Sequence, residues 1–547
     1  MIQVMIKNNR HDFAEGTTFA QAAAATAQNR LHPALGAVMN NKLYALSDRI
    51  PAGGQIVFLD IAHEEGARIY ARSAAFLLVR AVQELFDGAR VVIDHSINQS
   101  LYCEARWRRR VTAQDLKAIE RRMSEIIRRD EPFEQVRMDV AEARAVFLAS
   151  GRKDVAALIP QEGEYSCWRS GGFLDAWYGP LAPSAGYIRL FRLQYYLPGF
   201  LLMFPNAFSP QKVPVFQEMP KLSAAFQESA EWDGLIGVST LPGLNDMLRE
   251  GRGRNLVRMC ESRQDARIAR IAELICRERK RVILVAGPSS SGKTTFANRL
   301  MVHLKACGLK PLALSLDDYY LNRDTCPRLP DGTFDLESIG ALDTALFEEQ
   351  LTALLNGEEV ALARFDFITG KSGRADVKTS VAPGQPLIVE GINGLNDELT
   401  RCIPANIKFR VFASALTQLN IDDHNRVPTT DMRLIRRIVR DSLFRGRDAA
   451  RTIEDWPGVH QAEFRNIYPF QENAEVLFNS ALAYEPAALR TLALPMLTAI
   501  PAGSPARLEA DRLAAFLGLV EPLDCMDEIP PTSILREFVG GNTFYLK

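Results

Sequence analysis

The sequence lacks an excess of charge of either sign. It has 65 basic and 66 acidic residues, which leaves a formal net charge of −1. Such a balance gives no overall electrostatic reason to expect a nucleic acid or an anionic membrane as a partner, so a local patch would have to recognise any partner of that kind. We also find no internal repeat and no low-complexity segment.

Cysteines and long apolar runs are scarce as well. None of the eight cysteines forms a C-x-x-C pair, and none lies at metal-ligand spacing from the seven histidines. A disulfide framework and a zinc site are therefore not expected, and a reduced, cytosolic compartment fits best. Arg189 and Arg192 interrupt the most apolar stretch, 187–205, and residues 1–13 lack the apolar core of a signal peptide. We expect a cytoplasmic protein without a membrane span.

The length of 547 residues is too great for one hydrophobic core, so we expect several domains. Residues 1–61 alternate short apolar stretches with turn signals, among them Asn40-Asn41, and predict a small β-β-α-β-β unit of the β-grasp type. Residues 62–205 combine a helix over 71–86 with strands and predict a separate α+β domain.

The second half of the chain has a different pattern. Residues 206–280 carry Pro, Gly and Asn punctuation and end in an amphipathic helix, which suits a connecting segment. From 281 to 500, apolar strands alternate with helices, which is typical of a doubly wound α/β sheet, and 501–547 form a C-terminal extension. The expected buried parallel strands are 311–318, 385–392 and 407–413.

A phosphate-binding motif opens this half. Residues 287–294, GPSSSGKT, match G-x-x-x-x-G-K-[ST] in full, after an apolar strand and before a helix. The N–H groups of such a loop bind phosphates, Lys293 would reach the β/γ-phosphates, and the Thr294 hydroxyl would coordinate Mg²⁺, so we predict ATP and Mg²⁺ as cofactors. The predicted ATP-binding residues are Gly287, Pro288, Ser289, Ser290, Ser291, Gly292, Lys293, Thr294 and Thr295.

Neighbouring motifs distinguish the classes of P-loop protein. The guanine-reading N-K-x-D of GTPases is absent, and so is the apolar strand with a terminal Asp-Glu pair of motor ATPases. One strand and one helix after the P-loop stands LSLDDYY, residues 314–320. Asp317 would lie at the carboxyl edge of the sheet, where it could accept the proton of an attacking hydroxyl. The pattern favours a small-molecule kinase.

Residues 281 to about 490 resemble the uridine kinase and phosphoribulokinase group of P-loop kinases. The resemblance rests on the ordered motifs GPSSSGKTT, LDDYY, TFDLESIGALD, ARFDFITGKSGR, IVEGI and RRIVRDSLFRGRD. It implies that Asp317 is the catalytic base, that Glu390 is the carboxylate near Mg²⁺, and that Asp335 holds the sugar hydroxyls. The other substrate contacts that we predict are Tyr320, Phe365, Asp366 and Arg436.

An arginine-rich segment follows in the same resemblance. Arg436, Arg440 and Arg447 have roughly helical spacing, and Arg445 lies between the last two. Such guanidinium groups would neutralise the charge on the transferring phosphoryl oxygens, and the resemblance makes this segment the lid over ATP. The alternative is a solvated basic helix face. The predicted catalytic residues are Lys293, Asp317, Arg440, Arg445 and Arg447.

One departure from the family concerns the acceptor. Uridine kinases carry Y-D-F and, three residues later, a base-reading His, whereas this chain has Phe365-Asp366-Phe367 and then Gly370. The hydroxyl and the imidazole that would hydrogen-bond the pyrimidine are missing, and a site without them discriminates less between acceptors. Phosphoryl transfer to a hydroxyl is therefore better supported than uridine as the acceptor.

The front half resembles a different family. Residues 1 to about 60 resemble the TGS domain of threonyl-tRNA synthetases, and residues 62 to about 205 resemble their editing domain through ARSAAFLLVRAVQELF and GGFLDAWYGPLAPSAGYIRLFRL. No aminoacylation core can be identified, so we expect no charging of tRNA. Because none of the residues at the family's metal and catalytic positions is a usual zinc ligand, we predict a structural, regulatory or ligand-binding domain. Those residues are Arg72, Phe76, Trp177 and Leu181.

Basic clusters in this half leave RNA open as a partner. Arg106–Arg110 surround Trp107, and further pairs stand at Arg121-Arg122 and Arg128-Arg129. An indole flanked by arginines could stack on a base, whereas the alternative interpretation is a solvated face.

The complete order of domains resembles a bacterial family of nucleoside kinases whose ending is similar to PTSILREFVGG, residues 531–541. We predict ATP- and Mg²⁺-dependent phosphorylation of a nucleoside hydroxyl, with the 5′-OH of uridine or a relative as acceptor. A kinase of a sugar or polyol and an ATP-switched, RNA-associated regulatory protein are the alternatives. The sequence indicates neither the oligomeric state nor a preference between ATP and GTP.

Overall fold

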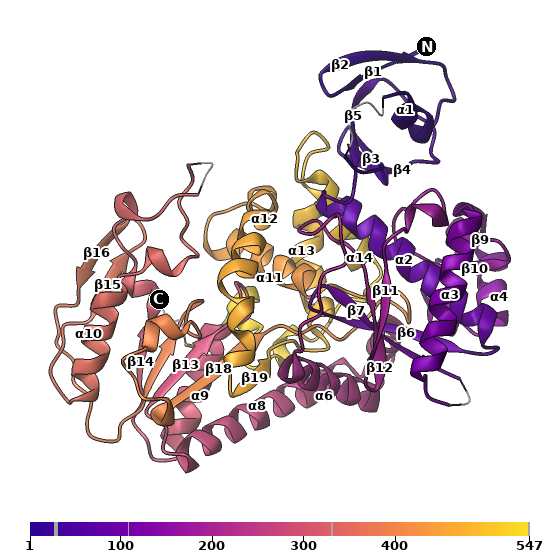
Figure 1. Ribbon diagram of the computed structural model, residues 1–547. Coiled ribbons are helices and arrows are strands. Elements are labelled where there is room, and N and C mark those ends of the chain that lie inside the picture. The colour runs from indigo at the N-terminus through magenta and orange to yellow at the C-terminus, as the bar shows by residue number, and fades with distance from the viewer. Residues whose placement is uncertain (27–30, 108, 330–331, 545–547) are drawn as a thin grey trace.

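The computed structural model describes the chain except for residues 27–30, 108, 330–331 and 545–547. Figure 1 shows a small N-terminal unit at one end, a second unit beside it, and the second half of the chain around a parallel sheet. Among the described residues, no helix is long and apolar enough to cross a membrane.

The N-terminal unit is one mixed sheet with the strand order β2-β1-β5-β3-β4 and one helix. It has five strands, one more than the sequence predicts. The hairpin at Asn40-Asn41 is confirmed, because both residues have positive φ and join two antiparallel strands. The elements are β1 (Ile2–Ile6), β2 (Asn9–Phe13), α1 (Phe19–Ala25), β3 (Gly36–Met39), β4 (Lys42–Ala45) and β5 (Gly54–Leu59).

The second unit contains two antiparallel sheets, with the orders β11-β12-β7-β6 and β10-β9-β8. The middle of its long first helix is buried and packs on the first sheet, as the apolar run over 71–86 predicts. The elements are α2 (Glu64–Leu85), β6 (Arg90–Ile97), β7 (Ser100–Arg106), α3 (Ala113–Arg129), β8 (Glu134–Asp139), α4 (Val140–Ala149), α5 (Lys153–Leu158), β9 (Glu164–Ser170), β10 (Phe173–Asp175), β11 (Arg192–Tyr196) and β12 (Gly199–Met203).

The C-terminal half is built on a parallel sheet with the order β14-β17-β13-β18-β19. Its first strand lies in the middle and later strands are added on both sides, which is the doubly wound arrangement that the sequence predicts. All five residues of that first strand are buried. The strands are β13 (Val282–Ala286), β14 (Leu312–Ser315), β17 (Leu387–Glu390), β18 (Lys408–Ser414) and β19 (Val476–Asn479), and β15 (Ala363–Asp366) and β16 (Lys371–Arg374) form a separate hairpin.

Helices before and after this sheet share one hydrophobic core with it. Ile268 from the connecting segment and Leu513 and Phe538 from the C-terminal extension belong to the same buried cluster as Phe296 beside the sheet. Both flanking segments are therefore integral to the packing of this half. The helices are α6 (Pro220–Ile236), α7 (Leu241–Arg249), α8 (Gly253–Arg277), α9 (Lys293–Ala306), α10 (Thr344–Leu355), α11 (Thr429–Phe444), α12 (Ala449–Asn466), α13 (Glu485–Thr498), α14 (Arg507–Gly518) and α15 (Arg536–Val539).

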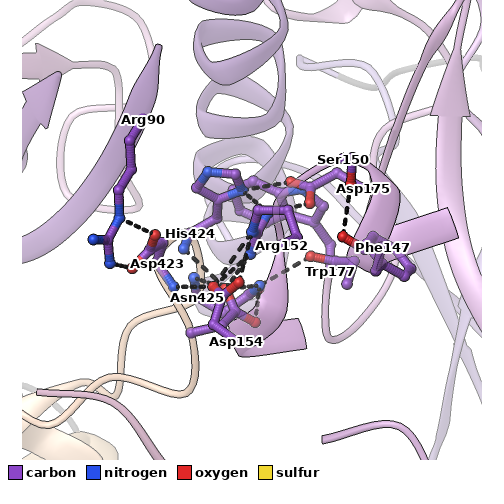
Figure 2. A network of polar contacts seen from close by, with 12 residues as sticks. Arg90, Phe147, Ser150, Arg152, Asp154, Asp175, Trp177, Asp423, His424 and Asn425 are labelled. Atoms are coloured by element: carbon purple, nitrogen blue, oxygen red, sulfur yellow. Dashed lines mark hydrogen bonds and ion pairs between the residues drawn. The ribbon is translucent and has the colours of Figure 1, made fainter. Parts of the chain in front are cut away.

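A buried polar network joins the second unit to the C-terminal half (Figure 2). At its centre the Arg152 guanidinium contacts Asp175 and His424, and its Nη2 donates to Asp422 Oδ1 at 3.1 Å. His424 Nδ1 lies 2.7 Å from Asp175 Oδ2. Since these charges are withdrawn from water, removing one of them would leave the others uncompensated, so the network specifies how the two parts dock.

The same interface continues at its edge. Arg90 donates two hydrogen bonds of 2.6 Å to the carboxylate of Asp423, and the N–H of Ile93 donates to the backbone oxygen of Asp423 at 2.8 Å. This segment of the C-terminal half connects β18 to α11. The second unit is therefore attached directly ahead of the arginine-rich helix.

Candidate active site

The loop between β13 and α9 is packed so closely at two positions that only glycine fits there. A Cβ atom on Gly287 would lie 1.9 Å from the backbone oxygen of Ala413, and one on Gly292 would lie 2.4 Å from Ile534 Cγ2. Gly292 also has a φ of +81°, which favours glycine. Lys293 is the first residue of α9, so the loop ends at a helix N-terminus, where backbone N–H groups bind anions.

Three charged side chains meet beside this loop. Lys293 begins α9, Asp317 follows β14, and Glu390 ends β17. Burial raises the pKa of Glu390 to about 7; the Asp317 carboxylate adds to this shift, whereas the Lys293 ammonium and the Thr294 hydroxyl oppose it. Asp317 keeps solvent-exposed surface, yet the protein atoms around it are close enough that burial raises its pKa as well, again opposed by Lys293. The structure thus brings Lys293, Thr294, Asp317 and Glu390 together.

A third carboxyl group at this place, that of Glu337, was not predicted from the sequence. Burial, reinforced by the charge of Glu463, raises the pKa of Glu337 to about 7, whereas Arg437 and Lys293 lower it. Glu337 stands two residues after Asp335 in the quoted TFDLESIGALD, so its position in that motif was the available signal. Because the charge of Lys293 acts on its pKa, Glu337 lies in the same cluster as Lys293.

The arginine-rich helix α11 lies against the loop. Arg437 Nη1 donates to Ser289 Oγ at 3.0 Å, and Arg440 Nη2 donates to Ser290 Oγ at 3.2 Å. Arg436 is fully buried, pairs with Glu485 and donates to the backbone oxygen of Ser290 at 3.2 Å. In this conformation Arg436 therefore stabilises the loop through its backbone. Its predicted contact with substrate stays a prediction.

The two later arginines lie beyond the end of α11. Arg445 is largely exposed, lies 3.4 Å from Asp441, and its charge lowers the pKa of Asp317. Arg447 forms an ion pair with Asp455 on α12. Of the predicted arginines, Arg440 touches the loop and Arg445 acts on Asp317 through its charge, whereas Arg447 is held by an acidic partner.

A buried acid that the sequence did not suggest also reaches the loop. The N–H of Ser289 donates to Glu463 Oε1 at 2.9 Å, and the Glu463 carboxylate is paired with Arg433. Glu463 lies on α12, more than 150 residues after the loop, so no local pattern could have assigned it.

Three aromatic rings gather on the side of Asp317 where Tyr320 lies. The ring centroids of Tyr320 and Phe365 are 5.6 Å apart, and those of Phe365 and Phe367 are 5.1 Å apart. The Tyr320 hydroxyl donates to the backbone oxygen of Leu336 at 3.0 Å, which ties this aromatic wall to the segment that contains Asp335. This side is therefore lined mainly by apolar ring surface.

Two further positions lie at the hairpin turn: Asp366, which agrees with the uridine kinase pattern, and Gly370, which departs from it. The Asp366 carboxylate accepts the N–H of Ile368 at 2.8 Å and the hydroxyl of Thr369 at 2.9 Å, so it holds the hairpin turn, and these bonds lower its pKa. Gly370 has a φ of +70°, and a Cβ there would lie 3.0 Å from Arg323 Cβ. A histidine at position 370 would be strained in this backbone.

The matched editing positions in the second unit are closed. Phe76 and Leu181 are buried in its core, and Trp177 donates its indole N–H to Asp175 at 2.9 Å. Arg72 pairs with Glu65 at 3.0 Å. Among the described residues, no group of His, Cys, Asp and Glu side chains is arranged to hold a metal ion.

The basic cluster of this unit is largely neutralised by its own neighbours. Arg109 donates two hydrogen bonds, of 2.6 and 2.8 Å, to Asp115, and Arg106 pairs with Glu104. Trp107 stacks on Phe86 with 4.2 Å between centroids. Arg108, which the predicted RNA contact also includes, lies outside the described residues, and RNA binding stays a prediction.

Comparisons with known proteins divide the chain in the same way. Residues 282–483 match the Phosphoribulokinase / Uridine kinase family. The N-terminal region is similar to threonine–tRNA ligases: it is 32% identical over 197 residues to that of Polaromonas naphthalenivorans (strain CJ2), which covers 35% of this chain and 31% of the relative. The chain thus spans about a third of the length of these curated relatives.

Two solved structures are similar to part of the chain. A candidate fructose transport system kinase from Silicibacter sp. TM1040 is 19% identical, with a TM-score of 0.26 over 38% of this chain and 97% of its own. A candidate uridine kinase from Bacillus stearothermophilus is 20% identical, with a TM-score of 0.25 over 37% and 89%.

Proposed function

We propose that the protein is an ATP-dependent kinase that transfers a phosphoryl group to a hydroxyl of a small molecule, with a nucleoside as the acceptor. The observation that carries this proposal is that Lys293 and Asp317 lie close together, one at the end of the P-loop motif and the other directly after the next strand, β14. The family match over residues 282–483 supports it.

In the proposed reaction the loop N–H groups and Lys293 hold the β- and γ-phosphates. The acceptor oxygen attacks the γ-phosphorus, the bond from that phosphorus to the β-γ bridging oxygen breaks, and the hydroxyl proton passes to Asp317. The raised pKa of Asp317 suits this role, because it strengthens the carboxylate as a base. Arg440 and Arg445 would offset the charge on the transferring oxygens.

The chain also offers a fitting place for Mg²⁺. Thr294 and Glu390 would hold it, and the negative charge of Asp317, which contributes to the raised pKa of Glu390, supports a cation at this place. Magnesium usually takes one or two protein ligands and completes its shell with water and phosphate oxygens, so a larger cluster of protein ligands is not needed. When bound, the ion supplies charge stabilisation for the phosphates.

A planar acceptor fits the aromatic wall. The rings of Tyr320, Phe365 and Phe367 provide stacking surface, and the Tyr320 hydroxyl is hydrogen-bonded to Leu336, the residue after Asp335. In the proposed complex Asp335 accepts hydrogen bonds from the sugar hydroxyls. These features support a nucleoside with its 5′-OH directed at Asp317. They also support broad tolerance of the base, because the polar groups that would read it are missing.

The test is phosphoryl transfer from labelled ATP to a panel of nucleosides, sugars and polyols, with Lys293→Ala as the blank. Labelled nucleoside monophosphate that is absent from the blank is the expected product. Transfer to a sugar or polyol alone would retain the chemistry and overturn the acceptor, and no transfer to any of them would overturn the kinase.

A further inference from the structure

The C-terminal extension reaches the phosphate-binding loop. Ile534 Cγ2 occupies the space beside Gly292 that a Cβ would need, and Asn542 Nδ2 lies 3.4 Å from Thr295 Oγ1. Both residues lie beyond residue 483, where the match to the kinase family ends. The loop is therefore completed by a segment that this family match does not cover.

Within this segment Glu537 bridges two helices of the site. Its Oε2 accepts the hydroxyl of Thr295, on α9, at 2.8 Å, and its Oε1 accepts Nη1 of Arg440, on α11, at 3.1 Å. The other terminal nitrogen of Arg440 donates to Ser290 Oγ at 3.2 Å. One carboxylate thus fixes the guanidinium that touches the loop.

Arg440 needs such a partner. Its side chain is only 12% exposed, burial lowers its pKa, and its Nε has no hydrogen-bond partner among the described residues. A guanidinium withdrawn from water in this way is stabilised by a paired carboxylate. Phe538, next to Glu537, adds its ring face, which lies 5.5 Å from the guanidinium carbon.

The segment is a permanent part of the core. Ser533, Ile534, Leu535 and Phe538 are fully buried, and the Ser533 hydroxyl donates to Glu261 on α8 at 2.5 Å. A loosely attached lid would not bury four of six neighbouring residues completely. Glu537 is therefore held in one place by the residues on both sides of it, which is what a group that orients another requires.

We propose that Glu537 is a positioning residue of the nucleotide site, which orients Arg440 toward the phosphates by tying it to Thr295. This inference rests on the proposed function in that it requires the loop to bind a nucleoside triphosphate. It adds that residues 533–538 belong to the nucleotide site, although they lie outside the matched kinase region.

The experiment compares full-length wild-type protein with Glu537→Gln, which keeps the size of the side chain and removes its charge. We expect ATP to bind about tenfold more weakly to the variant, and AMP, which lacks the β- and γ-phosphates, to change less than about twofold. Isothermal titration with each nucleotide measures this. A merely structural role would weaken ATP and AMP alike, and that result would overturn the proposal.

The matched control lies on the same extension. Glu528 pairs with Arg254 and Arg258 at the surface, away from the loop. Glu528→Gln should leave the affinity for ATP unchanged. An equal loss in both variants would show that the extension acts only through stability, which contradicts a positioning role.

A double variant tests the link to Arg440. If Glu537 acts through Arg440, then Glu537→Gln combined with Arg440→Met should bind ATP no more weakly than Arg440→Met alone. Additive losses would overturn the link. Should Glu537→Gln fail to fold, Thr295→Val removes the other anchor of Glu537, and we expect the same selective loss of ATP affinity.

ATP binding also separates this inference from the proposed function. Wild-type protein that binds ATP but phosphorylates no acceptor would overturn the kinase and leave the role of Glu537 to be decided by the affinities. Wild-type protein that binds no ATP would overturn both.

Discussion

The cluster of carboxyl groups around Lys293 and the editing-like positions of the second unit form an informative contrast. In this cluster, burial raises the pKa values of Asp317, Glu337 and Glu390, neighbouring carboxylates add to the shifts, and the positive charge of Lys293 offsets them only in part. In the second unit, two of the four positions that match the editing site, Phe76 and Leu181, are packed into the hydrophobic core. Unbalanced buried charge is typical of sites that receive a charged ligand, whereas positions occupied by packed apolar side chains leave no room for one.

Two buried charged residues of the second unit, Arg152 and Asp175, lie at its boundary with the C-terminal half. Asp175, two residues before Trp177, is fully buried and paired with Arg152 and His424 at the boundary with the C-terminal half. Burial would raise its pKa, and the charges of His424 and Arg152 reverse that effect so that the pKa is lowered. Balanced charge of this kind serves docking between domains.

The largest effect that we expect in this comparison is on turnover. Asp317→Asn keeps the size of the side chain and removes the proposed base. The rate of phosphoryl transfer should therefore fall by about 10² to 10⁴-fold while ATP still binds. Steady-state kinetics with the acceptor found in the panel measures this. Asp324→Asn, the same change at an exposed position seven residues later, is the control. A full rate in Asp317→Asn would remove Asp317 from the role of base.

The next effect is on the docking of the second unit. Arg152→Met leaves Asp175 and Asp422 buried without their cation, so the free energy of unfolding at this interface should fall by about 3 to 5 kcal/mol. Urea unfolding followed by a probe in each half measures the change. Arg169→Met, which breaks an exposed pair with Glu134, should cost less than about 1 kcal/mol. Equal costs would show that the buried network does not hold the two halves together.

How far the sequence predicts these two regions depends on the distance along the chain. The motif 287–294 and Asp317 are recognisable from short stretches of sequence, because phosphate binding and proton transfer need particular residues there. The structure brings the two close together. Glu463 and Glu537 reach the same loop from α12 and α15. Nothing in their own neighbourhoods distinguishes them from surface acids, because only the tertiary fold places them there.

The same reasoning applies to the front half. The loss of ligands at Arg72 and Trp177 is visible in the sequence, whereas the pairing of Asp175 with His424 joins segments about 250 residues apart. The basic cluster around Trp107 was ambiguous because its acidic partners, among them Asp115, are recognisable only once α3 is placed beside it.

A smaller effect concerns pH. The pKa of Glu390 is raised to about 7 in the folded protein from an ordinary value of 4.5. The protonated group therefore contributes stability that is fully present below about pH 4.5 and is lost as the pH rises through about 7. Glu390→Gln stays neutral at every pH, so at pH 8 it should be about 1 to 3 kcal/mol more stable than the wild type, and at pH 4 nearly equal to it.

Chemical unfolding at a series of pH values measures that difference. The exposed Glu134, exchanged for Gln, gives the baseline for removing a carboxylate. A stability gain for Glu390→Gln that is the same at pH 4 and pH 8 would contradict the unbalanced negative charge that we assign to Glu390 and its neighbours.

The smallest effect separates two hairpins of the N-terminal unit, only one of which the sequence reveals. Lys7-Asn8 joins β1 to β2 with φ values of 47° and 66°, and Asn40-Asn41 joins β3 to β4 with 50° and 59°. Asparagine adopts this left-handed conformation more readily than lysine, because its short side chain can hydrogen-bond the local backbone. Lys7→Asn should therefore stabilise the β1–β2 hairpin by about 0.5 kcal/mol, and Asn40→Lys should destabilise the β3–β4 hairpin by at least as much. Hydrogen exchange at the amides of the four strands measures both changes, and effects of the same sign would show that the turn conformation does not control these hairpins.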